Sequence, residues 1–174
     1  MKAMPSIVIF LAFPDQWDPK SPWHDRRVRL AAAQAVDQQA INEAERLGEG
    51  RLTGSIVHRQ FDFALPLEPY PYNPEHARRL LAEAGYPNGF DAGELTPPPP
   101  IYTIGESAAN DLAAVGIKAR MRLMERAAFF SAWQEKKLKG IILGAAAMQG
   151  NAAAVLETLA VTGGFYAYGG YPDI

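Results

Sequence analysis

The sequence contains no cysteine, and this absence excludes disulfides, thiolate chemistry and cysteine-ligated zinc. It also lacks an apolar run of about 18 residues, the length that a membrane-spanning helix needs. The apolar segment 7–13 is too short to span a membrane, and its flanks are wrong for a signal peptide. An excess of basic charge is missing as well, because 17 basic residues face 19 acidic ones. We therefore expect no nucleic-acid partner and no anionic membrane surface as a partner.

Motifs for nucleotides and nucleophiles are absent too. The glycine pairs at 163–164 and 169–170 lack the Lys-Ser/Thr of a phosphate-binding loop, and no Gly-x-Ser-x-Gly elbow occurs. The three histidines are scattered and lack metal-ligand spacing; they are His24, His58 and His76. We therefore predict no metal site and no cofactor.

Three acidic residues lie nearest to the proline run 97–100, namely Glu94, Glu106 and Asp111. A carboxylate pair can do acid–base work, but nothing in this spacing singles out a pair, and helix capping or solvation is the default interpretation. We therefore predict no catalytic residue and no enzyme. A hydrolase that uses Glu94 or Glu106 stays open as an alternative.

What is present predicts one α/β domain. The 174 residues suit a single domain, and 48% hydrophobic residues suffice for a core. Strands are predicted at 6–12 and 140–147 from continuous apolar runs, around 94–96, and at 117–124 from alternating apolar and basic residues. The four prolines that follow residue 96 exclude regular ladder pairing there.

Helices are predicted between these strands from capping residues and apolar stripes. The segment 49–72 has no clean period and is predicted to be a long ordered loop. The helix starts are Asp25, Asp37, Asn73, Thr103, the segment after 124 (to about Leu138) and Asn151 (to about Val161). Strands that alternate with helices in this order indicate a sheet with helices on its faces.

Three segments carry a resemblance to a known family. Residues 25–41, DRRVRLAAAQAVDQQAI, resemble the helix D-x-R-V-R-x-A-x-x-x-A-I-D-R-x-A-I. Residues 72–90, YNPEHARRLLAEAGYPNGF, are similar to Y-D-P-x-K-A-K-x-L-L-A-E-A-G-Y-P-x-G-F. Residues 111–118, DLAAVGIK, resemble x-L-x-x-I-G-I-K-V, and Met124, Glu125 and Trp133 follow them. The chain therefore resembles the extracellular solute-binding proteins of family 5, which bind peptides, nickel and opines.

The resemblance implies a periplasmic binding protein lobe of type II, with a mixed sheet flanked by helices. Such proteins close two lobes on a small solute and deliver it to the permease subunits of an ABC importer. It implies that residues 1–174 form a single, incomplete C-terminal lobe of a periplasmic or otherwise extracytoplasmic protein whose signal peptide lies outside this chain. A lobe without its sister exposes apolar surface, so we expect the isolated fragment to self-associate. A sensor or protein-interaction domain without transport is the alternative.

The strand that ends at residues 143–150 bears on the ligand. Peptide-binding members have G-W-x-A-D-Y there, with the Trp lining the cleft and the Asp pairing with the peptide's amine. This chain has Ala145 and Met148 at those two places. Without the carboxylate, a free α-amine loses a strong, orienting contact. We therefore expect a peptide-like, opine-like or other organic ligand that lacks a free amine and is acidic or aromatic.

The other candidate ligand-binding residues follow strand ends, where ligands collect in open α/β sheets. Arg126 stands where many members of the family carry Trp, and it either grips a carboxylate or phosphate or is a solvated residue at a helix start. Tyr166 and Tyr168 are weaker candidates. The full set of predicted ligand-binding residues is Tyr102, Thr103, Arg126, Ala145, Met148, Gln149 and Asn151.

Overall fold

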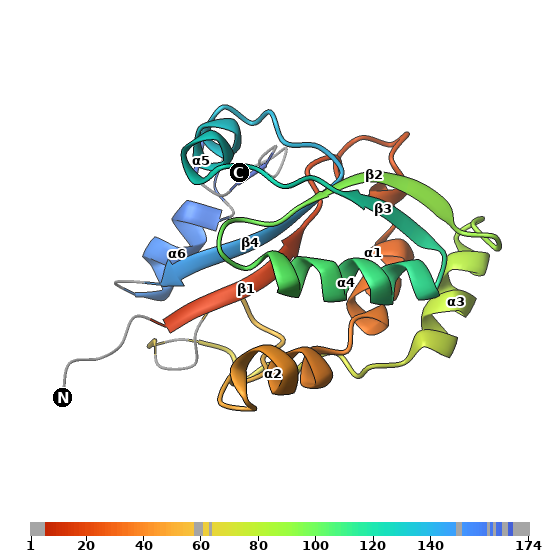
Figure 1. Cartoon of the computed structure of the whole chain (residues 1–174), viewed down its shortest axis with the longest axis horizontal. Helices are drawn as coiled ribbons and strands as arrows, with labels where there is room; N and C mark the ends of the chain where they lie inside the picture. Colours follow the sequence, from red (N-terminus) through yellow and green to blue (C-terminus); the bar gives the residue numbers. More distant parts are fainter. Residues whose placement is uncertain are drawn as a thin grey trace.

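The computed structural model describes residues 6–57, 61–62, 64–148, 151–159, 161, 163–164 and 167–168. This part of the chain contains four strands and six α-helices, three of which lie between the first two strands (Figure 1). In chain order they are β1 Ser6–Ala12, α1 Arg26–Ala35, α2 Gln38–Arg46, α3 Pro74–Glu83, β2 Phe90–Thr96, α4 Tyr102–Ala114, β3 Ile117–Met121, α5 Arg126–Gln134, β4 Ile141–Met148 and α6 Ala152–Leu159, with the short 3-10 helix η1 Pro22–His24 before α1.

The four strands form one mixed sheet in the order β1-β4-β2-β3. Strand β2 runs parallel to both β3 and β4, whereas β1 runs antiparallel to β4 along its whole length. The pairing of β2 with β4 joins Leu95 to Ile141 and Thr96 to Ile142, so β4 continues beyond the end of β2. The predicted α/β domain with a mixed sheet and flanking helices is confirmed.

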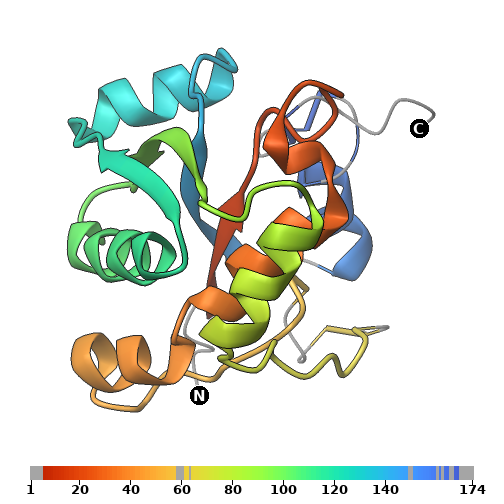
Figure 2. The same cartoon turned by 90° about the vertical axis from the view of Figure 1, so that its right-hand side faces the viewer.

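Helices cover both faces of this sheet. Ile141 belongs to the core that α1, α3 and α4 share with β2, and the next residue, Ile142, belongs to a second core with Phe129 and Trp133 of α5. Successive side chains of a strand point to opposite faces, so α1, α3 and α4 lie on one side and α5 on the other. Figure 2 shows α3 alongside α1. A third core beneath α6 joins Val155 to Val8 of β1.

Most predicted helix starts are confirmed by their capping contacts. The carboxylates of Asp25 and Asp37 accept the backbone N–H groups of residues 27 and 40 at 2.8 and 3.0 Å. The side-chain oxygens of Asn73 and Asn151 accept those of residues 76 and 154 at 2.9 and 3.0 Å. A short polar side chain at this position satisfies an N–H that the helix leaves open, which is why the signal is visible in the sequence.

The predicted cap at Thr103 is wrong. Helix α4 begins at Tyr102, and its N-cap residue is Ile101, two residues before the predicted cap, which makes no side-chain capping bond. Thr103 lies within the first turn, and its hydroxyl donates a hydrogen bond to Glu45 of α2 instead. The competing long-range acceptor explains why the local rule fails here.

Two predicted elements are shorter than expected. Strand β3 ends at Met121 instead of residue 124, because its partner β2 ends where the prolines without N–H groups begin. Helix α5 ends at Gln134 instead of about Leu138, and Lys136 adopts a left-handed φ of 57° just after it. The bounds of β2 extend back to Phe90, beyond the predicted residues 94–96.

Candidate functional site

Three strands end at one edge of the sheet, and three helices begin there. Because β2, β3 and β4 are parallel, their carboxyl ends point the same way, toward the left in Figure 1. The first turn of α4, helix α5 and helix α6 follow these ends. Ligands of open α/β sheets bind outside the carboxyl ends of the strands. The predicted ligand-binding residues are therefore expected at this edge.

The two candidates on α4 are held by neighbouring segments. The Tyr102 hydroxyl donates to the backbone carbonyl of Met124 at 2.7 Å and so ties the start of α4 to the loop after β3. The Thr103 hydroxyl donates to the Glu45 carboxylate at 2.6 Å and ties the same turn to α2. These bonds fix the position of the first turn. Because no side chain caps α4, the backbone N–H groups of that turn remain for water or another acceptor.

The N-terminus of helix α5, a place where an anion could bind, is capped by a carboxylate of the chain itself. The Glu125 carboxylate accepts the N–H groups of Ala127 and Ala128 at 2.9 and 3.4 Å. A ligand anion at this terminus has to compete with that carboxylate. Arg126 is exposed, and its guanidinium carbon lies 5.4 Å from the ring centroid of Phe130. A cation–π contact therefore orients the Arg126 side chain in this structure.

The end of β4 forms an apolar surface. Ala145 is half-buried and pairs with Ile9 of β1, whose side chain is 37% exposed. Ile7, two residues earlier on the same face, is 58% exposed. The backbone of Met148 pairs with Ser6 at the tip of the two strands. This end of the sheet offers hydrophobic contact area.

Of the remaining candidates at the end of β4 and after it, the structure describes the side chain of Asn151 but not those of Met148 and Gln149. Asn151 caps α6 through the N–H of Ala154 at 3.0 Å, which is a structural role for its side-chain oxygen. Gln149 and the side chain of Met148 lie outside the described residues, as do Tyr166 and His58. The structure thus places Tyr102, Thr103, Arg126 and Asn151 at or next to helix starts, and Ala145 within β4, three residues before its end.

Tyr168 has a packing role. Its hydroxyl accepts the N–H of Leu138 at 2.9 Å and donates to the carbonyl of Ala132 at 3.4 Å. Its ring packs edge-on against Trp133, with the centroids 6.1 Å apart. Burial raises the pKa of the Tyr168 hydroxyl above 10.0, and the N–H bond from Leu138 opposes the rise. These contacts hold the segment near Tyr168 against α5.

The candidate histidines and acids that lie in the described part of the chain do not form a cluster of potential metal ligands. His24 and His76 place their Nδ1 atoms 3.1 and 2.7 Å from Gln16 and Gln34 oxygens, respectively. Arg122 donates to Glu94 at 2.9 Å. Among the described residues, no group of three or more potential metal ligands lies together, and no helix is both long and apolar enough to cross a membrane.

The carboxyl group of Asp111 has a raised pKa. Its carboxylate is half-buried and accepts the backbone N–H of Asp37, the N-cap residue of α2, at 2.9 Å. Burial raises the pKa of the Asp111 carboxyl, the N–H bond opposes the rise, and the neighbouring Asp37 charge adds to it. The contact joins α4 to the start of α2, so its evident role is structural.

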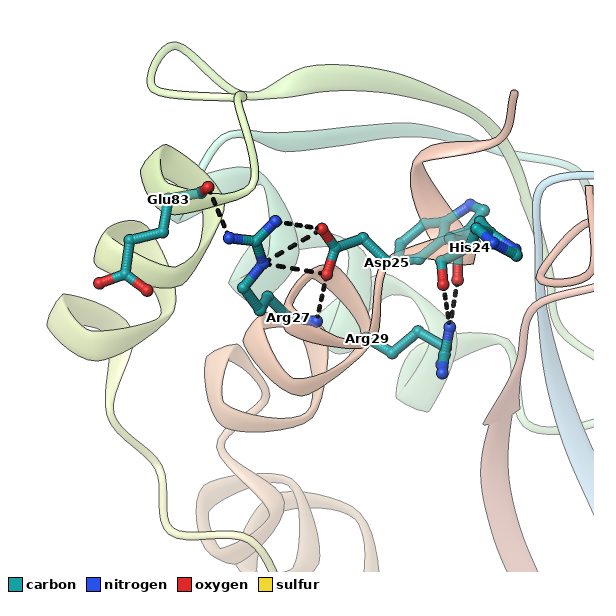
Figure 3. A network of polar contacts seen from close by, with 6 residues as sticks. His24, Asp25, Arg27, Arg29 and Glu83 are labelled. Atoms are coloured by element: carbon teal, nitrogen blue, oxygen red, sulfur yellow. Dashed lines mark hydrogen bonds and ion pairs between the residues drawn. The ribbon is translucent and has the colours of Figure 1, made fainter. Parts of the chain in front are cut away.

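The motif DRRVR builds a polar anchor between α1 and α3 (Figure 3). Arg27 donates to both oxygens of Asp25 and, at 2.7 Å, to the backbone carbonyl of Glu83 at the end of α3. Arg29 donates to the carbonyls of Trp23 and His24 at 2.6 and 2.9 Å. The Arg27 guanidinium holds the pKa of Asp25 below 3.8, and burial opposes this effect. The motif therefore has a structural role: Asp25 caps α1, and Arg27 holds α1 against the end of α3.

A surface depression of about 380 Å³ lies at the opposite end of the sheet. Asp15, Trp23, Phe90, Asp91 and Gly140 are among its lining residues, so it sits at the start of β2 and β4. This is the amino end of the parallel strands, where the fold does not favour ligands.

Sequence reasoning missed Glu45 as a neighbour of the site. Its partner Thr103 lies 58 positions further along the chain, and helical periodicity places Glu45 only on an outer face of α2. The exposure of Ile7 and Ile9 was also missed, because a continuous apolar run predicts a strand buried on both faces. No short sequence pattern reveals the contact between Thr103 and Glu45 or the exposure of Ile7 and Ile9.

Comparisons with known proteins agree with this fold. A family model described as "Bacterial extracellular solute-binding proteins, family 5 Middle" matches residues 2–167. Heme-binding protein A of Haemophilus influenzae is 33% identical over 144 residues, which cover 79% of this chain and 26% of that protein. The chain therefore spans about a quarter of this curated relative.

Solved structures show the same architecture. A dipeptide-binding protein from a Pseudoalteromonas species, in complex with Met-Leu, superposes with a TM-score of 0.79 at 23% identity, covering 96% of this chain and 35% of that one. The ABC transporter-associated periplasmic binding protein DppA from Helicobacter pylori, in complex with a peptide, gives 0.78 at 20% identity, covering 95% and 34%. At these identities the likeness shows the fold, which this chain shares with about a third of each structure.

Proposed function

The chain belongs to family 5 of the bacterial extracellular solute-binding proteins, and on this premise we propose that it forms one incomplete C-terminal lobe of the substrate-binding component of an ABC importer. The relatives are solute-binding proteins, and one of them is described as ABC transporter-associated. In this proposal a small organic solute binds between two lobes, of which residues 1–174 supply part of one. Permease subunits of the importer are the protein partner, the compartment is the periplasm, and the chain has no enzymatic activity.

The ligand-binding surface in this proposal is the carboxyl edge of the sheet. The observation that carries it is the combination of two partly exposed apolar residues on paired strands, Ala145 of β4 and Ile9 of β1, with the first turn of α4, whose N–H groups lack a side-chain cap. Apolar surface with a few well-placed polar groups is the usual composition of a ligand site. Tyr102 and Thr103 contribute by fixing that turn through their bonds to Met124 and Glu45.

The ligand in this proposal lacks a free α-amine. The resemblance places an Asp at position 148 and a Trp at position 145 in peptide-binding members, whereas this chain has Met148 and Ala145. A methionine cannot supply the counter-charge that an ammonium needs when it is desolvated. Replacing a Trp with an Ala also widens the site, so a bulkier organic group fits beside Ala145.

Arg126 is the proposed contact for an acidic group. Its fork binds carboxylates and phosphates bidentately, and in this structure it is exposed and lies over Phe130. A solute carboxylate can engage the guanidinium from the solvent side without breaking the ring contact. Gln149 and Asn151 complete the proposed set of ligand-binding residues, with Asn151 available through atoms other than its capping oxygen.

Calorimetry on the full-length protein tests the amine part of the proposal. The two probes are Met-Leu and N-acetyl-Met-Leu, which differ in the free amine and share the carboxylate. We expect the acetylated probe to bind at least as tightly as the free dipeptide. Met148→Asp is expected to reverse this preference, because it restores a counter-charge for the amine.

Two further variants serve as controls. Arg126→Ala is expected to weaken the acetylated probe, and Arg120→Ala, which removes an exposed arginine from β3, is expected to leave its affinity unchanged. Tight binding of unmodified Met-Leu that neither Met148→Asp nor Arg126→Ala alters contradicts the proposed ligand class.

A further inference from the structure

The turn between α3 and β2, at the right in Figure 1, contains the only Asn-Gly pair in the sequence, Asn88-Gly89. An asparagine side chain can react with the main-chain nitrogen of the residue that follows it. Glycine at that place has no side chain to hinder the approach, so Asn-Gly is the pair at which this reaction is easiest. The other four asparagines of the chain are followed by Glu, Pro, Asp and Ala. The sequence therefore concentrates this chemistry at Asn88.

A hydrogen bond closes the turn that contains this pair. The N–H of Gly89 donates to the carbonyl of Tyr86 at 3.0 Å, with Pro87 and Asn88 as the two central residues. The φ of Asn88 is not positive, which indicates a type I turn, because a type II turn requires a positive φ at that place. In a type I turn the ψ of the third residue is about 0°. The nitrogen that would react is thus engaged in a hydrogen bond, at a fixed torsion of the main chain.

We propose that Asn88 is a site of spontaneous deamidation that the folded turn protects and that unfolding exposes. In the reaction, the main-chain nitrogen of Gly89 loses its proton and attacks Cγ of Asn88. The new C–N bond closes a five-membered succinimide, and the side-chain nitrogen leaves as ammonia. Water then opens the ring at one of its two carbonyl groups and leaves an aspartyl or an isoaspartyl linkage at position 88. The reaction consumes water and releases ammonia, so it requires no other co-reactant.

The protection comes from the close packing of the turn against the start of β3. The succinimide ring is nearly planar and includes the Cα–C bond of Asn88, so closing it requires a large rotation about ψ and breaks the bond from Gly89 to Tyr86. The main chain of Gly89 lies against that of Gly116, because a Cβ added to Gly89 would collide with the Gly116 carbonyl. The same carbonyl accepts the N–H of Phe90 at 3.0 Å. In the folded chain the reaction therefore waits for local opening of this segment.

The isoaspartyl product is expected to prevent the turn from re-forming. It routes the main chain through the side chain of residue 88 and so adds one methylene before Gly89. Phe90 forms the first pair of β2 and β3, with Ile117, and its ring packs edge-on against Trp23, with the centroids 5.4 Å apart. A longer main chain displaces Phe90 from both contacts. The aspartyl product keeps the length of the main chain and is expected to be tolerated, because the Asn88 side chain is exposed.

Mass spectrometry of the chain aged at mildly alkaline pH, with and without unfolding concentrations of urea, tests the protection. Trypsin releases residues 80–118 as one peptide, which contains Asn88 and, as an internal reference, Asn110. In urea we expect the conversion of an amide to a carboxyl group at Asn88 and much less at Asn110. Without urea we expect the rate at Asn88 to be at least about tenfold lower, which corresponds to an opening free energy of about 1.4 kcal/mol. Equal rates with and without urea, or no conversion at Asn88 in urea, overturn the proposal.

Thermal denaturation of the refolded products tests the consequence for the fold. Chain aged in urea is refolded by dilution, and its isoaspartyl form is separated by chromatography. We expect that form to melt at a lower temperature than the unaltered chain. Asn88→Asp is the matched control, because it adds the same charge without lengthening the main chain, and it is expected to melt close to the unaltered chain. An isoaspartyl form as stable as Asn88→Asp contradicts the role assigned to the Gly89–Gly116 contact.

Discussion

The contact between Asp111 and the start of α2 gives a prediction that separates hydrogen bonding from charge. Asp111→Ala removes the oxygen that accepts the Asp37 N–H at 2.9 Å, and Asp111→Asn keeps an oxygen there but removes the charge. Leaving a buried donor unsatisfied costs about 1–3 kcal/mol. Because Asp111 is only half-buried, water reaches the gap, and we expect the lower end, about 1 kcal/mol, for the alanine variant.

The asparagine variant is expected to be at least as stable as the unaltered protein at neutral pH. Burial and the Asp37 charge raise the pKa of Asp111 above its ordinary value of 3.8, so the ionised carboxylate is less favourable in the folded chain than in the unfolded one. Between the ordinary and the raised pKa, the folded state binds more protons. Stability due to this group is therefore greatest below pH 3.8 and decreases as the pH rises through the raised pKa.

Urea denaturation followed by circular dichroism measures both effects. A loss of about 1 kcal/mol corresponds to a decrease of about 0.5 M in the urea midpoint, for a slope of about 2 kcal/mol per molar. The difference in the free energy of unfolding between the asparagine variant and the unaltered protein reports on Asp111 alone, because the other carboxyl groups are the same in both. An alanine variant with an unchanged midpoint refutes the hydrogen-bond argument. An asparagine variant that gains stability over the unaltered protein as the pH falls refutes the charge argument.

Three further predictions concern the fold. Trp133→Ala removes a fully buried ring, and we expect a loss of about 3–5 kcal/mol in urea denaturation; a loss below about 1 kcal/mol contradicts the assigned packing. Asp25→Ala removes the cap of α1, and we expect a loss of about 0.5–2 kcal/mol. Because Arg27 lowers the pKa of Asp25, this difference is expected to persist at neutral pH and to disappear as the pH falls below 3.8 through the lowered pKa. Gly89→Ala is expected to lower the melting temperature, because Gly89 has a φ of 73° and an added Cβ meets the Gly116 carbonyl; an unchanged melting temperature contradicts this close approach.

Local signals in the sequence predicted most of the helices. Asp25, Asp37, Asn73 and Asn151 each cap a helix in the structure, as expected. A cap depends on a side chain and an N–H group two or three residues apart, so a single short segment contains the whole interaction. The same holds for the alternating pattern that identified β3.

Long-range contacts account for what the sequence could not reveal. Strand β2 begins at Phe90, but Gly93 has a φ of 78° and the pairing with β3 shifts between Asp91 and Gly93, which breaks the alternation that identifies a strand. Thr103 looked like a cap, and only the approach of Glu45 from α2 gives its hydroxyl another partner. Interactions between residues this far apart leave no periodic trace.

The candidate site was predicted in outline. Strand order and direction place Tyr102, Thr103, Arg126 and Asn151 at or next to helix starts, which the order of strands and helices made foreseeable, whereas Ala145 lies within β4. The individual roles were not foreseeable. Tyr102 turned out to bond Met124, and the Glu125 carboxylate was found to cap α5 beside Arg126. Whether these residues also contact a solute stays a prediction.

The amide chemical shifts of this chain, followed during titration with N-acetyl-Met-Leu, test the proposed binding surface most directly. This measurement detects weak binding, which suits the single lobe that we propose. The account predicts shifts at the carboxyl edge, at Tyr102, Thr103 and Ala145, and none at Gly93 and Gly140 in the depression at the opposite end. Shifts confined to Gly93 and Gly140, or an unchanged carboxyl edge at saturating probe, contradict the account.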